Sequence, residues 1–216
     1  MAVKSLLNWL DPIRLDEREK FLKKSVTHLI GTSPSNLTLY RLAFLHASAS
    51  KESVAENYKE SNERLEFLGD SVLGMITATY LFQKFPFKDE GFLTEIRSRM
   101  VSRESLNVIG RKLGLEEVIE YESQRKNAMS RTSMYGDALE AFVGAIYLDK
   151  GYNYCNKFIY DKVIIPYVDI PKLEGKITSY KGLIIEWCQK QKKKYYIETY
   201  EDTGNEPVKH FSVKIS

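Results

Sequence analysis

Three carboxylates recur at helical spacing in an otherwise apolar segment, NERLEFLGDS, which runs from Asn62 to Ser71. With about 100° of rotation per residue, Glu63, Glu66 and Asp70 fall on one stripe of a helix. The remainder of that helix is apolar nearly all round, which is typical of a central helix packed on several sides. We therefore expect these carboxylates to be partly desolvated and to repel one another.

A second segment, GDALEAFVGAIYLD, repeats the arrangement, with Asp137 and Glu140 one turn apart. Carboxylates crowded in a low dielectric either take up protons or bind a cation, and an all-oxygen ligand set suits Mg²⁺ or Mn²⁺. Small residues would let the two helices approach closely, namely Gly69, Gly74, Gly136 and Gly144. The pattern therefore predicts a divalent-metal site between two helices.

Two other interpretations of the acids were weighed against this metal site. An acidic pair on a helix is often a solvated surface feature without a ligand. A di-iron carboxylate bundle needs Glu-x-x-His on two helices, and none of the three histidines lies in that motif. The cysteines Cys155 and Cys188 have no C-x-x-C partner, so neither a thiolate zinc site nor a disulfide framework is expected. Two acidic helices in one apolar body favour the divalent-metal site.

The elements that carry these residues are predicted to be helices, because apolar residues recur at helical spacing between Gly and Pro punctuation. The expected helices span residues 14–30, 36–47, 62–83, 91–102, 103–113, 133–150 and 152–165. Gly31, Gly114 and Gly151 are expected to end three of them. The polar segment from Ser123 to Ser133 is predicted to be an exposed loop, and KESVAENYKE a solvated insertion.

Charge and pattern divide the chain into a body and a tail. Pro171 to Ser216 contains nine Lys against six acidic residues, whereas the remainder is balanced. The tail pattern predicts an amphipathic helix ending at Lys194, followed by the strand-like runs YYIETY and HFSVKI. We expect a helical domain over residues 1–168, a linker over 169–176 and a small α+β unit over 177–216.

Composition narrows the functional classes. With 43% hydrophobic and 28% charged residues, 216 residues can bury a sizeable core. No uninterrupted apolar run approaches the roughly 20 residues of a membrane span, and Asp11 and Pro12 fall where a signal peptide would stay apolar. The lone thiols suit a reducing compartment. We therefore expect a cytoplasmic protein with no membrane partner and no organic cofactor.

The two acidic segments resemble a known family. NERLEFLGDS resembles the signature motif of the ribonuclease III family, and GDALEAFVGAIYLD resembles that family's second acidic helix. LTLYRLAFLHASAS and KDEGFLTEIRSRMVSRESL resemble the segments on either side of the signature, and the tail resembles the first part of a double-stranded RNA-binding domain. The resemblance implies a mainly α protein: an all-helical endonuclease domain followed by an incomplete α+β RNA-binding domain of helix, strand and strand.

The resemblance also implies an activity. It predicts a homodimeric endoribonuclease that cleaves double-stranded RNA by two-metal-type hydrolysis with Mg²⁺, or Mn²⁺ as a substitute. The products would carry 5′-phosphate and 3′-hydroxyl ends with a short 3′ overhang, as in processing of ribosomal precursors or other structured RNA. The alternative is a catalytically idle scaffold of the same fold that only binds double-stranded RNA. Retention of all six matching acids favours the enzyme.

Site residues carry over by position in the matching motifs. The carboxylates that match metal ligands are Glu66, Asp70, Asp137 and Glu140. The catalytic set implied by the resemblance is Asp70, Glu140, Glu63 and Glu90. The implied RNA contacts are Arg97 and, on the tail helix, Glu186 and Gln189. Phe67 matches the aromatic residue of the dimer interface.

Overall fold

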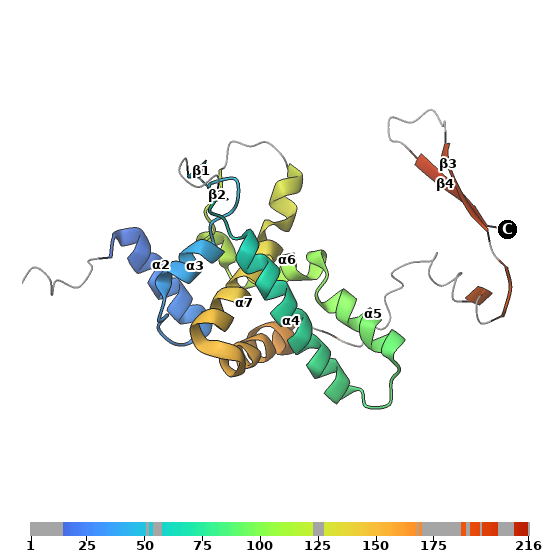
Figure 1. The fold of residues 1–216 in the computed structure, drawn as a ribbon, viewed down its shortest axis with the longest axis horizontal. Helices are drawn as coiled ribbons and strands as arrows, with labels where there is room; N and C mark the ends of the chain where they lie inside the picture. Colours follow the sequence, from blue (N-terminus) through green and yellow to red (C-terminus); the bar gives the residue numbers. More distant parts are fainter. Residues whose placement is uncertain are drawn as a thin grey trace, which may run out of the picture. The chain divides into compact units, whose positions relative to one another are not determined.

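The computed structural model describes most of the body and parts of the tail. The described residues are 15–50, 52–53, 58–122, 128–167, 169, 187–188, 191–194, 196–202 and 210–215. The chain divides into two compact units, Met1–Leu173 and Glu174–Ser216. The described part of the first unit is almost entirely helical, as predicted (Figure 1).

The helices of the body follow the predicted order with shifts of a few residues. Their bounds are α2 (Glu17–Ile30), α3 (Leu37–Ala43), α4 (Glu63–Lys84), α5 (Glu90–Met100), α6 (Arg103–Lys112), α7 (Ala128–Ile159) and α8 (Ile165–Tyr167). A 3₁₀ turn, η1 (Leu115–Glu117), follows α6, and a π turn, η2 (Tyr160–Ile164), follows α7. Gly31, Gly114 and Gly151 have φ angles of 80°, 74° and 78° at the predicted breaks. The break at Gly151 divides α7 into two helical segments.

Side chains placed just before three helices explain where those helices begin. Asp16 and Glu19 form a capping box at α2, in which the Glu19 N–H donates to Asp16 Oδ1 at 2.7 Å. Asp89 accepts from the Phe92 N–H at the start of α5, and Ser102 accepts from the Ser105 N–H at the start of α6. Each acceptor satisfies a donor that has no partner within its helix. The caps at Asp89 and Ser102 therefore determine the residues at which α5 and α6 begin.

The core is built around α7, against which α4 and α6 pack (Figure 1). Phe142 is fully buried at its centre, with ring centroids 5.8 Å from Tyr40, 5.2 Å from Phe44 and 5.5 Å from Phe158. These are separations at which aromatic rings attract one another beyond simple burial. Helices α3 and α7 are therefore joined by a continuous aromatic cluster.

Helices α4 and α7 approach so closely that their backbones touch. A Cβ atom added at Gly69 would lie 1.7 Å from the Glu140 carbonyl oxygen, and one added at Gly144 would lie 2.5 Å from the Leu65 carbonyl oxygen. Neither position has room for any side chain. The small residues predicted to permit close approach do so at these two positions.

Asp149, at the end of the first α7 segment, ties the loop before α3 to the core. Its carboxylate accepts from the Ser35 and Asn36 N–H groups at 3.0 and 2.9 Å and from the Tyr40 hydroxyl at 2.9 Å. Burial raises the pKa of this carboxyl, but these donors, together with Lys150, outweigh burial and hold the pKa below its usual value. Asp149 therefore makes these hydrogen bonds as a charged carboxylate.

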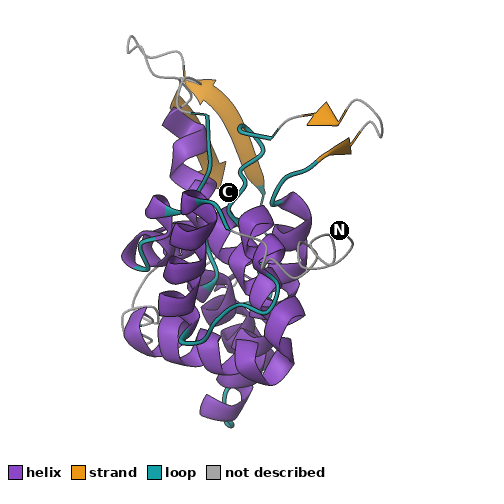
Figure 2. Ribbon diagram, turned by 90° about the vertical axis from the view of Figure 1, so that its left-hand side faces the viewer, coloured by secondary structure: helices purple, strands orange, loops and turns teal. Residues whose placement is uncertain are grey.

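One prediction for the body was wrong in detail, and one segment has structure that was not predicted. Residues 128–133 of the predicted loop belong to α7, because Ala128, Met129 and Arg131 are good helix formers and no Gly or Pro interrupts them. The predicted solvated insertion contains an antiparallel pair, β1 (Glu52–Ser53) and β2 (Tyr58–Lys59), which projects from the helical body (Figure 2). The body is thus not purely helical.

Among the described helices, α4 is long and apolar enough to cross a membrane by length and composition alone. Seven of its residues are buried, and the helix packs along α7. Core helices meet the same criterion when they are covered on several sides. The acidic stripe of α4 is therefore carried by an element of the core.

The tail unit contains one antiparallel pair, β3 (Ile197–Asp202) and β4 (His210–Ile215), in register from Ile197↔Ile215 to Asp202↔His210. The second predicted strand has these bounds, whereas β3 lies two residues beyond the first prediction. The predicted helix end at Lys194 was wrong, because the chain turns at Gln191 and Lys192, where Lys192 has φ 51°. Successive lysines repel one another, which disfavours a further helical turn.

The contact at Gly69 predicts a large cost for a single methyl group. Gly69→Ala should destabilise the protein by about 3 kcal/mol or more, because the added carbon must displace the backbone of α7. Gly91→Ala is the matched control: its Cβ meets only Asp89 Oδ1 at 3.6 Å, so the change should be neutral or stabilising by up to about 1 kcal/mol. Urea unfolding measures both. Equal stability of the two variants would contradict the close approach.

Candidate metal centre

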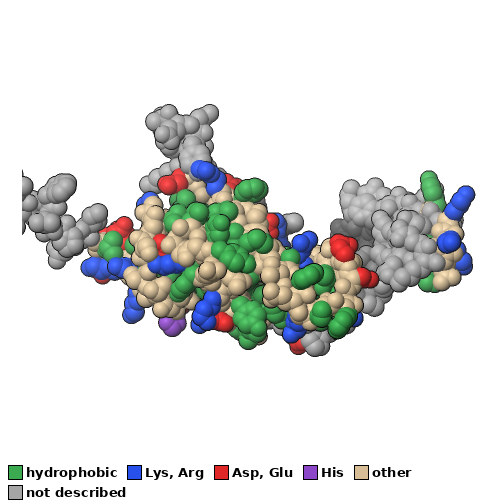
Figure 3. Space-filling model, turned by 60° about the horizontal axis from the view of Figure 1, so that its bottom comes forward, with side chains coloured by type: hydrophobic (Ala, Val, Ile, Leu, Met, Phe, Trp, Pro, Cys, Tyr) green, Lys and Arg blue, Asp and Glu red, His purple; other side chains and the backbone are tan. Residues whose placement is uncertain are grey.

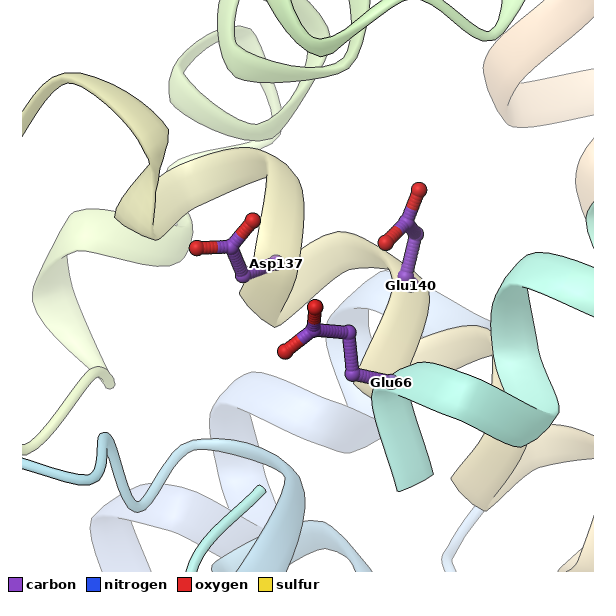
Figure 4. Close-up of side chains that lie close together, drawn as sticks. All are labelled: Glu66, Asp137 and Glu140. Atoms are coloured by element: carbon purple, nitrogen blue, oxygen red, sulfur yellow. The ribbon is translucent and has the colours of Figure 1, made fainter. Parts of the chain in front are cut away.

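Three carboxylates from two helices meet at the N-terminal end of α4. One oxygen each from Glu66 of α4 and from Asp137 and Glu140 of α7 can be chosen so that all three lie within 4.8 Å of one another. All three side chains are partly exposed, and they point into one space between the helices (Figure 4). This is a spacing that a single cation could bridge.

The close contact of the helices explains why these carboxylates meet. Gly69 lies between Glu66 and Asp70 in sequence, and its Cα faces the backbone carbonyl of Glu140. Gly144, one turn after Glu140, faces the carbonyl of Leu65, which directly precedes Glu66. With the backbones in contact, side chains just beside the contact must project into a shared space. The acids occupy that space.

The electrostatics of the cluster are unfavourable without a cation. Burial raises the pKa of Glu140 to about 8, and the negative charges of Asp70, Glu66 and Asp137 act in the same direction. Burial likewise raises the pKa of Glu66, and the negative charges of Asp137 and Glu63 raise it further. Crowded carboxylates of this kind are neutralised either by protons or by a bound cation.

The donor set fits a hard divalent cation. All three potential ligands are carboxylate oxygens, which Mg²⁺ and Mn²⁺ prefer, and partial exposure leaves room for water in the remaining positions. Among the described residues no histidine or cysteine joins this group. The residues present therefore suit the ion predicted from the sequence.

Asp70 and Glu63 lie beside the cluster without joining its three-residue core. Asp70 is exposed, yet its charge raises the pKa of both Glu66 and Glu140. Glu63 is also exposed, accepts from the Ser61 hydroxyl at 2.8 Å and raises the pKa of Glu66. Both carboxylates are thus close enough to act on the charge of the site.

Glu90 and Arg97 lie elsewhere on the same chain. Both line a groove between α5 and the C-terminal half of α4, together with Phe82. Glu90 accepts from the Thr94 hydroxyl at 2.9 Å. Within one chain, the structure therefore does not bring Glu90 to the three clustered carboxylates.

Phe67 is 79% exposed on α4, although it is a large apolar residue inside the signature segment. Met75 and Phe82 on the same helix are 48% and 71% exposed. At 100° per residue, both lie within about 80° of Phe67, so they share one side of α4. Exposed apolar side chains are also visible as green patches on one face of the body (Figure 3).

The predicted tail contacts, Glu186 and Gln189, lie outside the described residues. Two residues on α6 near the site had no signal in the sequence pattern. The positive charge of Arg103 lowers the pKa of Glu66 and Glu140, against the effect of burial. Asn107 accepts a hydrogen bond from the N–H of Gly136, directly before Asp137. Both depend on α6 crossing α7, which residue spacing along the chain does not encode.

Comparison with known proteins places this geometry in a family. The Ribonuclease-III-like family profile matches residues 36–167. The chain is 49% identical over 187 residues to Ribonuclease 3 of Zunongwangia profunda, covering 87% of this chain and 76% of that protein. It is 40% identical over 216 residues to Ribonuclease 3 of Bacteroides fragilis, covering 97% and 73%.

A solved structure also has this fold. It is the nuclease domain of ribonuclease III from Campylobacter jejuni, described with flexibility in a region involved in dimer formation. The two chains are 31% identical with a TM-score of 0.58, covering 65% of this chain and 94% of that domain. The part compared is thus nearly the whole of a nuclease domain.

The raised pKa of Glu140 predicts how stability depends on pH without metal. The folded state keeps a proton on Glu140 up to about pH 8, whereas the unfolded chain releases it near 4.5, so stability falls as pH rises through that window. Glu140→Gln abolishes this loss. In EDTA, the variant should melt about 2–4 °C above the parent at pH 8, which corresponds to about 1 kcal/mol. At pH 4.5 the difference should vanish, and a constant difference across the range would contradict the assignment.

Proposed function

Because this chain belongs to the ribonuclease III family and is an endoribonuclease, we propose that it cleaves double-stranded RNA with Mg²⁺ at the Glu66, Asp137 and Glu140 cluster. The observation that carries this proposal is the convergence of three carboxylate oxygens within 4.8 Å. The products proposed are 5′-phosphate and 3′-hydroxyl ends with a short 3′ overhang. Mn²⁺ would serve as a substitute ion.

In this proposal, carboxylate side chains of the protein bind the metal ion and hold it in place. Glu66, Asp137 and Glu140 would hold the ion, and Asp70 and Glu63 would add negative charge beside them. A bound divalent ion supplies stabilisation of phosphate charge and a lowered pKa for an attacking water. The proton held by Glu140 without metal would leave when the ion binds. No protein nucleophile is needed.

Recognition of the duplex would depend on groups away from the acids. A carboxylate cluster repels phosphates, so affinity must come from basic side chains and from the shape of A-form RNA, read across its wide minor groove. Arg97 is an exposed arginine in the groove between α4 and α5 and is our candidate phosphate contact. The tail, residues 177–216, would be the first part of a double-stranded RNA-binding domain, with Glu186 and Gln189 as its groove contacts.

We further propose that two copies assemble through α4. The exposed apolar side chains of Phe67, Met75 and Phe82 share one side of that helix and would be covered by a second copy. A two-fold dimer presents the same patch from both subunits and carries two sites, one for each RNA strand. Such a dimer would produce the proposed staggered cut in both strands.

The second candidate is an idle RNA-binding scaffold. It is disfavoured because a scaffold gains nothing from partly buried carboxylates that repel one another and raise the pKa of Glu140. RNA processing in the cytoplasm, including ribosomal precursors, is the setting we propose. A metal-dependent nuclease needs these carboxylates as ion ligands despite their mutual repulsion, whereas a scaffold does not need them.

Replacing Glu140 by Gln tests the metal-dependent chemistry. The change preserves the shape of the side chain but removes the negative charge of one proposed ligand. Cleavage of a labelled RNA duplex at millimolar Mg²⁺ should therefore fall at least about 100-fold. Binding of the same duplex, measured in EDTA, should remain or improve because a repelling charge is lost.

Asp161→Asn is the control for this experiment. Asp161 is an exposed acid that pairs with Lys157 at 2.5 Å near the end of the helical body, and its loss should leave cleavage unchanged. Parental cleavage by Glu140→Gln across a range of Mg²⁺ concentrations would refute the assigned role.

Replacing Phe67 by Ala tests the proposed dimer. Removing this exposed ring should weaken self-association at least about tenfold, since a buried aromatic anchor contributes a large share of an interface. Sedimentation equilibrium measures the dissociation constant. Phe21→Ala removes a half-exposed ring from α2 and should not change assembly. A parent protein that stays monomeric at micromolar concentration would rule out the dimer.

A further inference from the structure

Helix α6 contacts α7 at the residue just before Asp137. The Oδ1 atom of Asn107 accepts a hydrogen bond from the Gly136 N–H at 2.9 Å. Its Nδ2 atom donates to the Arg103 carbonyl, one turn back on α6, at 2.8 Å. Since one end of the amide must donate and the other must accept, these two partners fix its orientation. The Asn107 side chain therefore links the backbone of α7 to that of α6 through two hydrogen bonds.

At Gly136 the backbone of α7 lies against α6. A Cβ atom at this position would lie 3.4 Å from the Asn107 backbone nitrogen and 3.5 Å from its Cγ, which is ordinary van der Waals contact, so the two helices already touch here. A glycine inside a helix also loosens it, at a cost of about 1 kcal/mol relative to alanine. The hydrogen bond from Asn107 restrains the backbone of α7 at this glycine.

The other α7 carboxylate is held in a different way. The backbone of Glu140 is pinned by Gly69 of α4, and that of Gly144 by Leu65. Asp137 is one turn before this contact. On its other side, α6 touches α7 at Tyr135, whose carbonyl would lie 2.5 Å from a Cβ on Gly110. The backbone of α7 around Asp137 is therefore in contact with α6 as well as with α4.

We propose that Asn107 is a positioning residue, which holds the Asp137 carboxylate at the distance from Glu66 and Glu140 that a divalent cation requires. This inference rests on the proposed metal site and adds a third helix, α6, to it. Residues behind metal ligands commonly set ligand geometry, and their loss weakens metal binding about 10–100-fold.

Mn²⁺ binding without RNA tests the proposal. Titration of the purified protein, followed by calorimetry or by the electron paramagnetic resonance signal of free Mn²⁺, gives an affinity that does not depend on turnover. Asn107→Ala should bind Mn²⁺ about tenfold more weakly than the parent. Alanine favours helix, so α6 should persist, which circular dichroism checks.

A matched control separates positioning from general stability. Asn36 also accepts from a backbone N–H, that of Thr38 at 3.1 Å, but it caps α3. Asn36→Ala should lower the melting temperature to a similar degree as Asn107→Ala and leave Mn²⁺ affinity unchanged. If both variants lose the same affinity, Asn107 is merely structural and the proposal is overturned.

Restoration of cleavage by excess Mn²⁺ is a second measurement of the same defect. Excess Mn²⁺ should restore duplex cleavage by Asn107→Ala, with an unchanged KM for RNA, because the defect lies in ion affinity. A failure of excess Mn²⁺ to restore cleavage would contradict the proposal.

Asp137→Asn distinguishes this inference from the metal site itself. If Asp137→Asn abolishes Mn²⁺ binding while Asn107→Ala binds like the parent, the site stands and the role of Asn107 is refuted. If Asp137→Asn also binds like the parent, the metal site fails and the role of Asn107 fails with it.

Discussion

The backbone contact between α4 and α7 is the constraint on which the site depends. Gly69 faces the Glu140 carbonyl and Gly144 faces the Leu65 carbonyl, so each helix presents a glycine to the backbone beside an acid of the other. At this separation no side chain fits between the helices. The carboxylates next to the contact converge because the backbones of the two helices that carry them are in contact.

When no cation is bound, the convergence of these carboxylates destabilises the folded state through their mutual repulsion and partial burial. Burial and three neighbouring carboxylates raise the pKa of Glu140 to about 8, and the positive charge of Arg103 offsets only part of that effect. The aromatic cluster around Phe142 and the helix caps supply stability away from the acids. A rigid body of this kind can keep repelling carboxylates together, and in the proposed metal-bound state a divalent ion would take the place of the proton on Glu140.

Much of this architecture follows from local patterns. Helical periodicity, glycine stops and the acidic stripe predicted α4, α7 and the convergence of Glu66 with Asp137 and Glu140. The start of α7 at Ala128 was missed because polar side chains concealed a helix-forming sequence. The roles of Arg103 and Asn107 could not be predicted, since each depends on how α6 crosses α7. Spacing along one helix predicts which residues share a face, and packing decides what that face meets.

In the proposed site, Glu66, Asp137 and Glu140 together hold a divalent cation. Anomalous X-ray scattering from crystals grown with Mn²⁺ measures this most directly, because it locates the ion independently of any activity. An anomalous peak bonded to carboxylate oxygens of all three residues is expected. Ordered carboxylates with no peak between them at millimolar-range Mn²⁺, or a peak bound only by acids outside this group, would contradict it.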